Sequence, residues 1–119
     1  MNALGHMTAG LAAEMDQSID MCFLEYQDKD GSIHPHISHF PFIILAADNS
    51  NKIRSVRNEA IARNIPYNDF TSTMTVGTSQ DQVEATANTQ ELNLEYFGIV
   101  MFGKTVDIKQ FTNKFSLFR

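Results

Sequence analysis

Residues 41–65 constrain the fold of this chain more than any other segment. Residues 42–47 are a continuous apolar run, too short to cross a membrane and typical of a strand covered on both faces in a parallel sheet. Residues 48–50 supply turn and N-cap chemistry, and apolar side chains then recur at helical spacing. Pro66 ends that helix, and an extended segment begins at Tyr67. A strand, a helix and a strand in this order predict a βαβ unit and an α/β fold.

Apolar periodicity and turn residues predict the other elements of one domain over residues 1–119. In chain order they are a helix (3–15), a strand (21–27), an irregular extended arm (32–40), a strand (67–75), a short exposed helix behind a capping box of Ser79 and Gln82, a strand (94–102), a helical turn (106–112) and a terminal strand or docked tail (115–118). Pro35 argues against a ladder strand in the arm. His6 falls opposite the apolar stripe of its helix, and Arg57 is expected on the solvent side of the later one.

Composition limits the partners that we expect. A chain of 119 residues with 43% apolar side chains is large enough for one core. Cys22 is the single cysteine, which excludes an internal disulfide and indicates a reducing cytoplasm. The sequence has no signal peptide and no apolar run of about 18 residues, so we expect a cytoplasmic protein without a membrane span. A net charge of −5 disfavours nucleic acid and favours a small or neutral partner, and no motif predicts a cofactor.

The first predicted helix has no strand before it, although an α/β chain normally enters through a strand. Either such a strand is lost by truncation or a misassigned start, or something else covers the sheet edge that it would have filled. An uncovered edge is an aggregation hazard, and a second copy of the chain is the simplest cover. This argument predicts a homodimer.

Five stretches in order along nearly the whole chain carry a family resemblance: Asn2–Met7, Phe42–Leu45, Asn68–Met74, Glu95–Gly98 and Lys114–Leu117. They resemble a bacterial family of unknown function that is grouped by fold with the type II peptidyl-tRNA hydrolases. The resemblance implies a three-layer α/β/α domain with a mixed sheet. It also implies an N-terminal strand that this chain lacks, in agreement with the argument above.

The first helix departs from the pattern of the true hydrolases. These enzymes open the helix with a Gly-Lys pair and place a glutamine and then a histidine further along it. Gly5 matches the glycine, but His6 stands at the lysine position, while Gly10 and Ala13 replace the glutamine and the histidine. The resemblance therefore implies a titratable imidazole in place of the lysine.

The second signature of the hydrolases is an aspartate followed four residues later by a threonine, and Asp69 and Thr73 match it. If His6 and Asp69 face each other at the carboxyl ends of the strands, Asp69 orients the imidazole. His6 then acts as a general base on water or on the Thr73 hydroxyl, which predicts a hydrolase of a small ester or peptide-like substrate. The alternative is a non-catalytic module that binds a small ligand or dimerises, with His6 in solvent and Asp69 and Thr73 in local turn hydrogen bonds.

The histidines of the arm are a second candidate cluster. His34, His36 and His39, with Asp30, are residue types that bind zinc or nickel. Their spacing matches no strong signature, and loop histidines are more often solvated or hydrogen-bonded, so we predict no metal site. Cys22 lies among apolar neighbours, which favours an inert thiol in the core.

Overall fold

The computed structural model describes residues 2–15 and 22–118, except for the side chain of His36. Its helices are α1 (Asn2–Glu14), α2 (Ser50–Ala62), α3 (Ser79–Ala87) and α4 (Thr105–Thr112), with 3₁₀ turns η1 (Ser72–Thr75) and η2 (Glu91–Asn93). Its strands are β1 (Phe23–Gln27), β2 (Ile33–Ser38), β3 (Leu45–Ala46), β4 (Tyr67–Thr71), β5 (Tyr96–Met101) and β6 (Ser116–Leu117). None of the helices in these ranges is long and apolar enough to cross a membrane.

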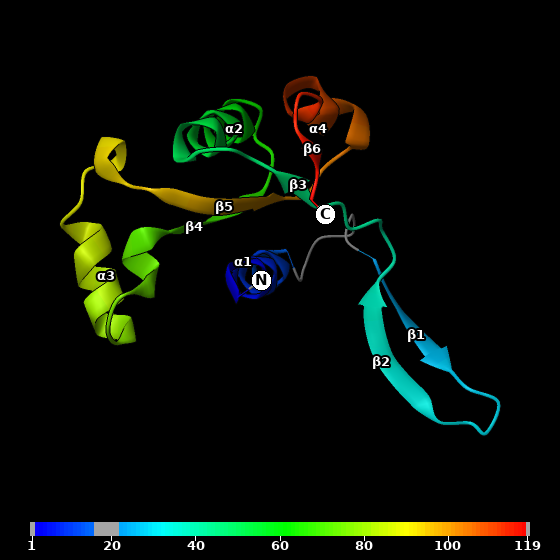
Figure 1. Ribbon diagram of the computed structural model, residues 1–119. Helices are drawn as coiled ribbons and strands as arrows, with labels where there is room; N and C mark the ends of the chain where they lie inside the picture. The colour runs from blue at the N-terminus through cyan, green and yellow to red at the C-terminus, as the bar shows by residue number, and fades with distance from the viewer. Residues whose placement is uncertain (1, 16–21, 119) are drawn as a thin grey trace.

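Helices cover both faces of the antiparallel β4–β5 pair at the centre of the molecule. α1 packs on one face, and α2 packs on the other with α4 beside it (Figure 1). The buried residues of these helices are Met7 and Leu11 in α1, and Val56 and Ala60 in α2. They recur at helical spacing, which is why both helices can be predicted from the sequence. The prediction of a fold that mixes helices and strands is confirmed.

Residues 42–47 are not the doubly covered strand that their apolar sequence predicts. Only Leu45 and Ala46 form a strand, β3, which pairs antiparallel with β6. Phe42 is 56% and Ile43 is 62% exposed. β3 and β4, which flank α2, lie in separate two-stranded sheets, and every strand pairing in the described residues is antiparallel. The predicted parallel βαβ pairing is therefore wrong for this part of the chain, because an apolar run becomes a buried strand only where other elements cover both its faces.

The N-terminal caps of two helices follow local side-chain chemistry. Asn49 caps α2 through its side-chain oxygen, which accepts a backbone N–H of the first turn at 3.0 Å. The predicted capping box of Ser79 and Gln82 is wrong by one residue. Thr78 N–H donates to Asp81 Oδ2 at 2.9 Å, and Asp81 N–H donates to Thr78 Oγ1 at 3.2 Å. No residue of α3 is buried, so the prediction of a short exposed helix is confirmed.

β2 is a bulged ladder strand, where the sequence predicts an irregular arm that is not part of a ladder. It pairs antiparallel with β1, with Leu24 opposite Ile37 and Tyr26 opposite His34. The register shifts between these two pairs, and Pro35 lies in the shifted part of β2. A bulge tolerates a proline because the residue there donates no ladder hydrogen bond. The β1–β2 hairpin, called the arm below, extends away from the rest of the molecule (Figure 1).

Candidate functional site

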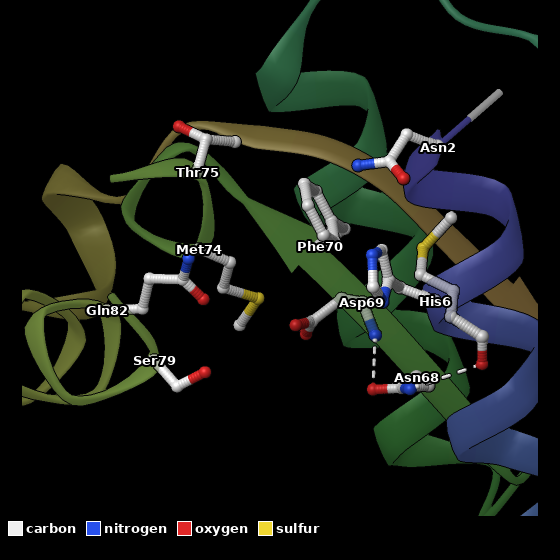
Figure 2. A pocket seen from close by; sticks show the side chains of 10 residues that line it. Asn2, His6, Asn68, Asp69, Phe70, Met74, Thr75, Ser79 and Gln82 are labelled. Carbon is white, nitrogen blue, oxygen red and sulfur yellow. Dashed lines mark hydrogen bonds between the residues drawn. The ribbon is translucent and has the colours of Figure 1, made fainter. Parts of the chain in front are cut away.

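A groove with a volume of about 540 Å³ lies between α1, β4 and α3. This volume is in the range of pockets that hold small molecules. Figure 2 shows Ser79 and Gln82 of α3 on one side of the groove, and His6 and Asp69 on the other. The lining side chains are apolar, amide, hydroxyl, imidazole and carboxylate groups: Asn2, His6, Met7, Asn68, Asp69, Phe70, Met74, Thr75, Ser79 and Gln82.

His6 lies on the exposed side of α1, as predicted from its position opposite the apolar stripe. Its imidazole stacks on the Phe70 ring of β4, with ring centroids 6.2 Å apart and planes inclined by 20° (Figure 2). Within the described residues no hydrogen bond engages the imidazole nitrogens. The ring is therefore held in place at the groove while its nitrogens stay available to a bound molecule.

Asp69 is paired with Arg57 of α2. Arg57 Nε donates to Asp69 Oδ2 at 3.0 Å, and the two side chains are 22% and 18% exposed. The guanidinium also lies 5.8 Å from the ring centroid of Tyr67 and 5.7 Å from that of Tyr96. Burial opposes the positive charge, but the two tyrosines and Asp69 outweigh it and raise the pKa of Arg57. In the described chain no hydrogen bond joins Asp69 to His6, so Arg57 is the residue that balances this carboxylate.

Thr73 lies in η1 and does not line the groove. Its hydroxyl is 2.7 Å from Thr71 Oγ1 and 2.7 Å from Thr86 Oγ1, and Thr86 Oγ1 donates to the Gln82 carbonyl at 2.8 Å. This chain of hydroxyls fastens η1 to α3 and thereby fixes one wall of the groove. Of the three predicted catalytic residues, the structure brings His6 and Asp69 to one groove and places Thr73 behind its wall.

Asn68 connects α1 to β4 at the base of the groove. Its Nδ2 donates to the Met7 carbonyl at 3.2 Å, and its Oδ1 accepts the Asp69 N–H at 3.0 Å (Figure 2). A side chain at Gly10 would collide with the Asn68 amide. Gly10 therefore permits the close approach of α1 to β4 at Asn68.

A family model described as a protein of unknown function (DUF2000) matches residues 1–119. The chain belongs to the DUF2000 family. This confirms the predicted resemblance to a family of unknown function. A search of the curated proteins gives no match to this DUF2000 protein. The solved structure of a protein of unknown function from Agrobacterium tumefaciens strain C58 is similar, with a TM-score of 0.81 and 15% identity over 99% of this chain and 85% of that chain. At this identity the likeness shows the fold alone, and neither match names a peptidyl-tRNA hydrolase.

Sequence reasoning missed the role of Arg57 in this DUF2000 protein. The prediction of a solvated side chain was wrong, because Arg57 reaches over β4 and β5 to Asp69 and the tyrosines. A signal was present in the sequence. Arg57 lies four residues after Ile53 and three before Ala60, and thus on the apolar face of α2. Phe70 and Met74 were also missed as groove residues, because their apolar side chains suggest packing.

His34 and His39 are the members of the predicted histidine cluster whose side chains the structure describes. No group of three or more histidine, cysteine, aspartate or glutamate side chains is arranged to bind a metal within the described residues. His34 Nε2 lies 3.0 Å from Asp28 Oδ2, and this hydrogen bond with His34 lowers the pKa of Asp28. His39 lies edge-on to Phe40, and the side chain of His36 is outside the described set. Cys22 is half-buried.

Proposed function

We propose that this DUF2000 protein binds a small, uncharged, peptide-like molecule in the groove. The observation that carries the proposal is the His6 ring, which is stacked on Phe70 with its nitrogens unengaged at the edge of a 540 Å³ groove. The described lining residues contain no lysine or arginine, and Arg57 neutralises the Asp69 carboxylate. A phosphate or carboxylate ligand would therefore find no strong counter-charge.

The lining also favours a particular ligand chemistry. Met7, Phe70 and Met74 offer apolar and aromatic contacts, while Asn2 and Gln82 offer amide donors and acceptors. A molecule with a peptide bond beside an aromatic or apolar group complements both sets. An acylated aromatic amino acid is the simplest example of this class.

A second candidate is hydrolysis of a small ester or peptide-like substrate, with His6 and Asp69 as the catalytic residues and Thr73, the third residue predicted, holding the wall of the groove. The observation that favours it is that His6 and Asp69 line the same groove. His6 would take a proton from water as the general base, and Asp69 would stabilise the resulting imidazolium. Water is the better nucleophile in this candidate, because the Thr73 hydroxyl is already held by Thr71 and Thr86.

We further propose that the protein is a cytoplasmic homodimer. We also propose that each copy is a three-layer α/β/α domain with a fold like that of the type II peptidyl-tRNA hydrolases. Helices on both faces of β4–β5 support the layering. Large apolar side chains that stay exposed in a single copy, such as Ile43 and Leu117, support the dimer.

Two probes separate the binding and hydrolysis candidates: N-acetylphenylalanine amide and the matching methyl ester. We expect both to give saturation-transfer NMR signals with the wild type. The His6→Ala variant should bind the amide about fivefold more weakly, since a hydrogen bond from the imidazole contributes about 1 kcal/mol. The control is His39→Ala, which removes a histidine that also lies against a phenylalanine but outside the groove.

The same samples report turnover of the ester. An intact ester with His6-dependent binding supports the ligand-binding function. Hydrolysis that falls about 100-fold or more in His6→Ala supports the enzyme instead. Equal binding of the amide to wild type and His6→Ala would contradict the proposed ligand site.

A further inference from the structure

The arm exposes an apolar face that its own chain does not cover. Leu24 and Tyr26 alternate along β1 and therefore point to one face, and Ile37 lies directly opposite Leu24 on β2. These three side chains are 39%, 48% and 61% exposed. Figure 1 shows the arm leading away from the helices and from β4–β5. In the described chain β1 and β2 pack chiefly on each other.

An isolated two-stranded hairpin is marginally stable in water, because it has no third element on which to bury a face. The arm is such a hairpin within one copy of the chain. Its Leu24 and Ile37 side chains lie opposite each other and are exposed, so a covering surface would remove apolar area from water. The arm therefore needs a surface on which to pack.

A second apolar surface lies on the body of the molecule. Leu45 of β3 is paired with Leu117 of β6, and Ile43 precedes Leu45 by two residues in the same extended segment. All three side chains are exposed, and they are called the strip below. A hydrogen bond from Phe118 N–H to the Ile44 carbonyl at 2.9 Å extends the β3–β6 ladder. The backbone that carries the strip is therefore held by ladder hydrogen bonds. Because the arm leads away from β3–β6, it does not cover the strip of its own chain (Figure 1).

The area that one copy leaves exposed matches the needs of a stable dimer. The accessible surface is 8643 Å², whereas a compact monomer of this mass exposes roughly 6,500 Å². The radius of gyration is 16.4 Å, compared with about 13.5 Å for a compact chain of this length. The excess is roughly 2,000 Å² per copy, which leaves room for the roughly 800 Å² that each partner buries in an interface of standard size.

We propose that two copies of this chain exchange arms, so that the Leu24, Tyr26 and Ile37 face of each arm packs on the strip of the other copy. One chain carries both surfaces, so a twofold axis uses each of them twice and leaves neither exposed. The inference rests on the homodimer proposed above and specifies which residues hold it together. It does not depend on what the groove binds.

Sedimentation velocity over a range of protein concentrations tests the arrangement. We expect a dimer for the wild type and monomers for Ile37→Asp and Leu117→Asp, with a dissociation constant raised roughly 30-fold or more. The matched control is Leu92→Asp. Leu92 is 78% exposed in η2, outside both surfaces, and its replacement should leave the dimer unchanged. Circular dichroism confirms that each variant is folded.

Mixing the two variants distinguishes arm exchange from a general loss of stability. A mixed dimer retains one intact contact, between the wild-type arm of the Leu117→Asp copy and the wild-type strip of the Ile37→Asp copy. We therefore expect mixed dimers at concentrations where each variant alone is monomeric. Absence of mixed dimers would overturn the exchange.

The other outcomes are equally decisive. A wild type that stays monomeric would overturn the homodimer as well as the exchange. A wild-type dimer that persists in Ile37→Asp and Leu117→Asp would overturn the exchange alone and leave the homodimer in place. Binding of N-acetylphenylalanine amide to the monomeric variants reports separately on the groove.

Discussion

Two regions of the molecule differ in how far their side chains find partners within one copy: the region around α2 and β5, and the region of the arm and strip. Arg54 of α2 donates to Glu91 Oε2 at 2.9 Å and to the Leu94 carbonyl at 2.6 Å, and lies 5.2 Å from the ring centroid of Tyr96. The arm and strip, in contrast, leave apolar side chains such as Ile37 and Leu117 exposed. The first region thus pairs its polar groups within one copy, whereas the second leaves apolar side chains exposed, which is the basis of the proposed arm exchange.

Among the variants in the region around α2 and β5, removal of Arg57 should cause the largest change in the free energy of unfolding. The Arg57→Ala variant leaves the Asp69 carboxylate without its partner at a position that is 18% exposed. We expect the free energy of unfolding to fall by about 3 kcal/mol, measured by urea denaturation. The matched control is Lys52→Ala, which breaks a pair with Asp48 whose side chains are 44% and 83% exposed. That variant should lose far less, because solvent screens an exposed pair. Equal losses in both variants would show that the Arg57–Asp69 pair contributes no more to stability than an exposed pair.

Two valines compare a buried helix position in the first region with an exposed helix position outside both regions. Val56 of α2 is 6% exposed, and Val83 of α3 is 63% exposed. The Val56→Ala variant should lose about 2 kcal/mol of unfolding free energy, because it removes buried methyl groups and leaves a cavity. The Val83→Ala variant should change it by less than about 0.5 kcal/mol. A Val83→Ala loss as large as that of Val56→Ala would mean that α3 is covered in solution.

The loss of stability at alkaline pH should also come from the region around α2 and β5. Burial and the hydrogen bond to Glu91 raise the pKa of Tyr96 from 10.0 to about 12. The folded state holds the phenol proton more tightly than the unfolded state. This contribution to stability is therefore complete below pH 10.0 and is lost as the pH rises toward 12.

Urea unfolding at several alkaline pH values checks the effect. We expect wild type to lose about 2 kcal/mol more than Tyr96→Phe over this interval, because the variant has no phenol to titrate. Parallel curves for wild type and Tyr96→Phe would contradict the assignment.

The elements that could be predicted from the sequence are those whose buried residues recur at a regular spacing along a short segment. α1 and α2 carry their buried residues at helical spacing, and Asn49 caps α2 through its own side chain. The extent of β3 was not predictable, because coverage of an apolar run depends on which distant elements pack on it. Thr78 and Ser79 both carry a hydroxyl that could cap α3. Thr78 is the cap, because its backbone is extended and lies just before the first helical residue.

The candidate site shows the same division. The exposure of His6 follows from its angle on α1, so its place outside the core was predicted correctly. The partner of Asp69 was not predicted, because it depends on how α2 docks on β4. The Thr73 hydroxyl finds Thr86 on α3 only after the chain folds, so its environment also lay beyond local reasoning.

Hydrogen exchange at two protein concentrations, one above and one below the dissociation constant of the dimer, tests the contrast between the two regions most directly. We predict that amides of α2, β4 and β5 keep the same protection at both concentrations. Amides of β1, β2, β3 and β6 should lose protection on dilution, because their cover is another copy of the chain. Protection of the arm that is high and independent of concentration in a monomeric protein would contradict the account.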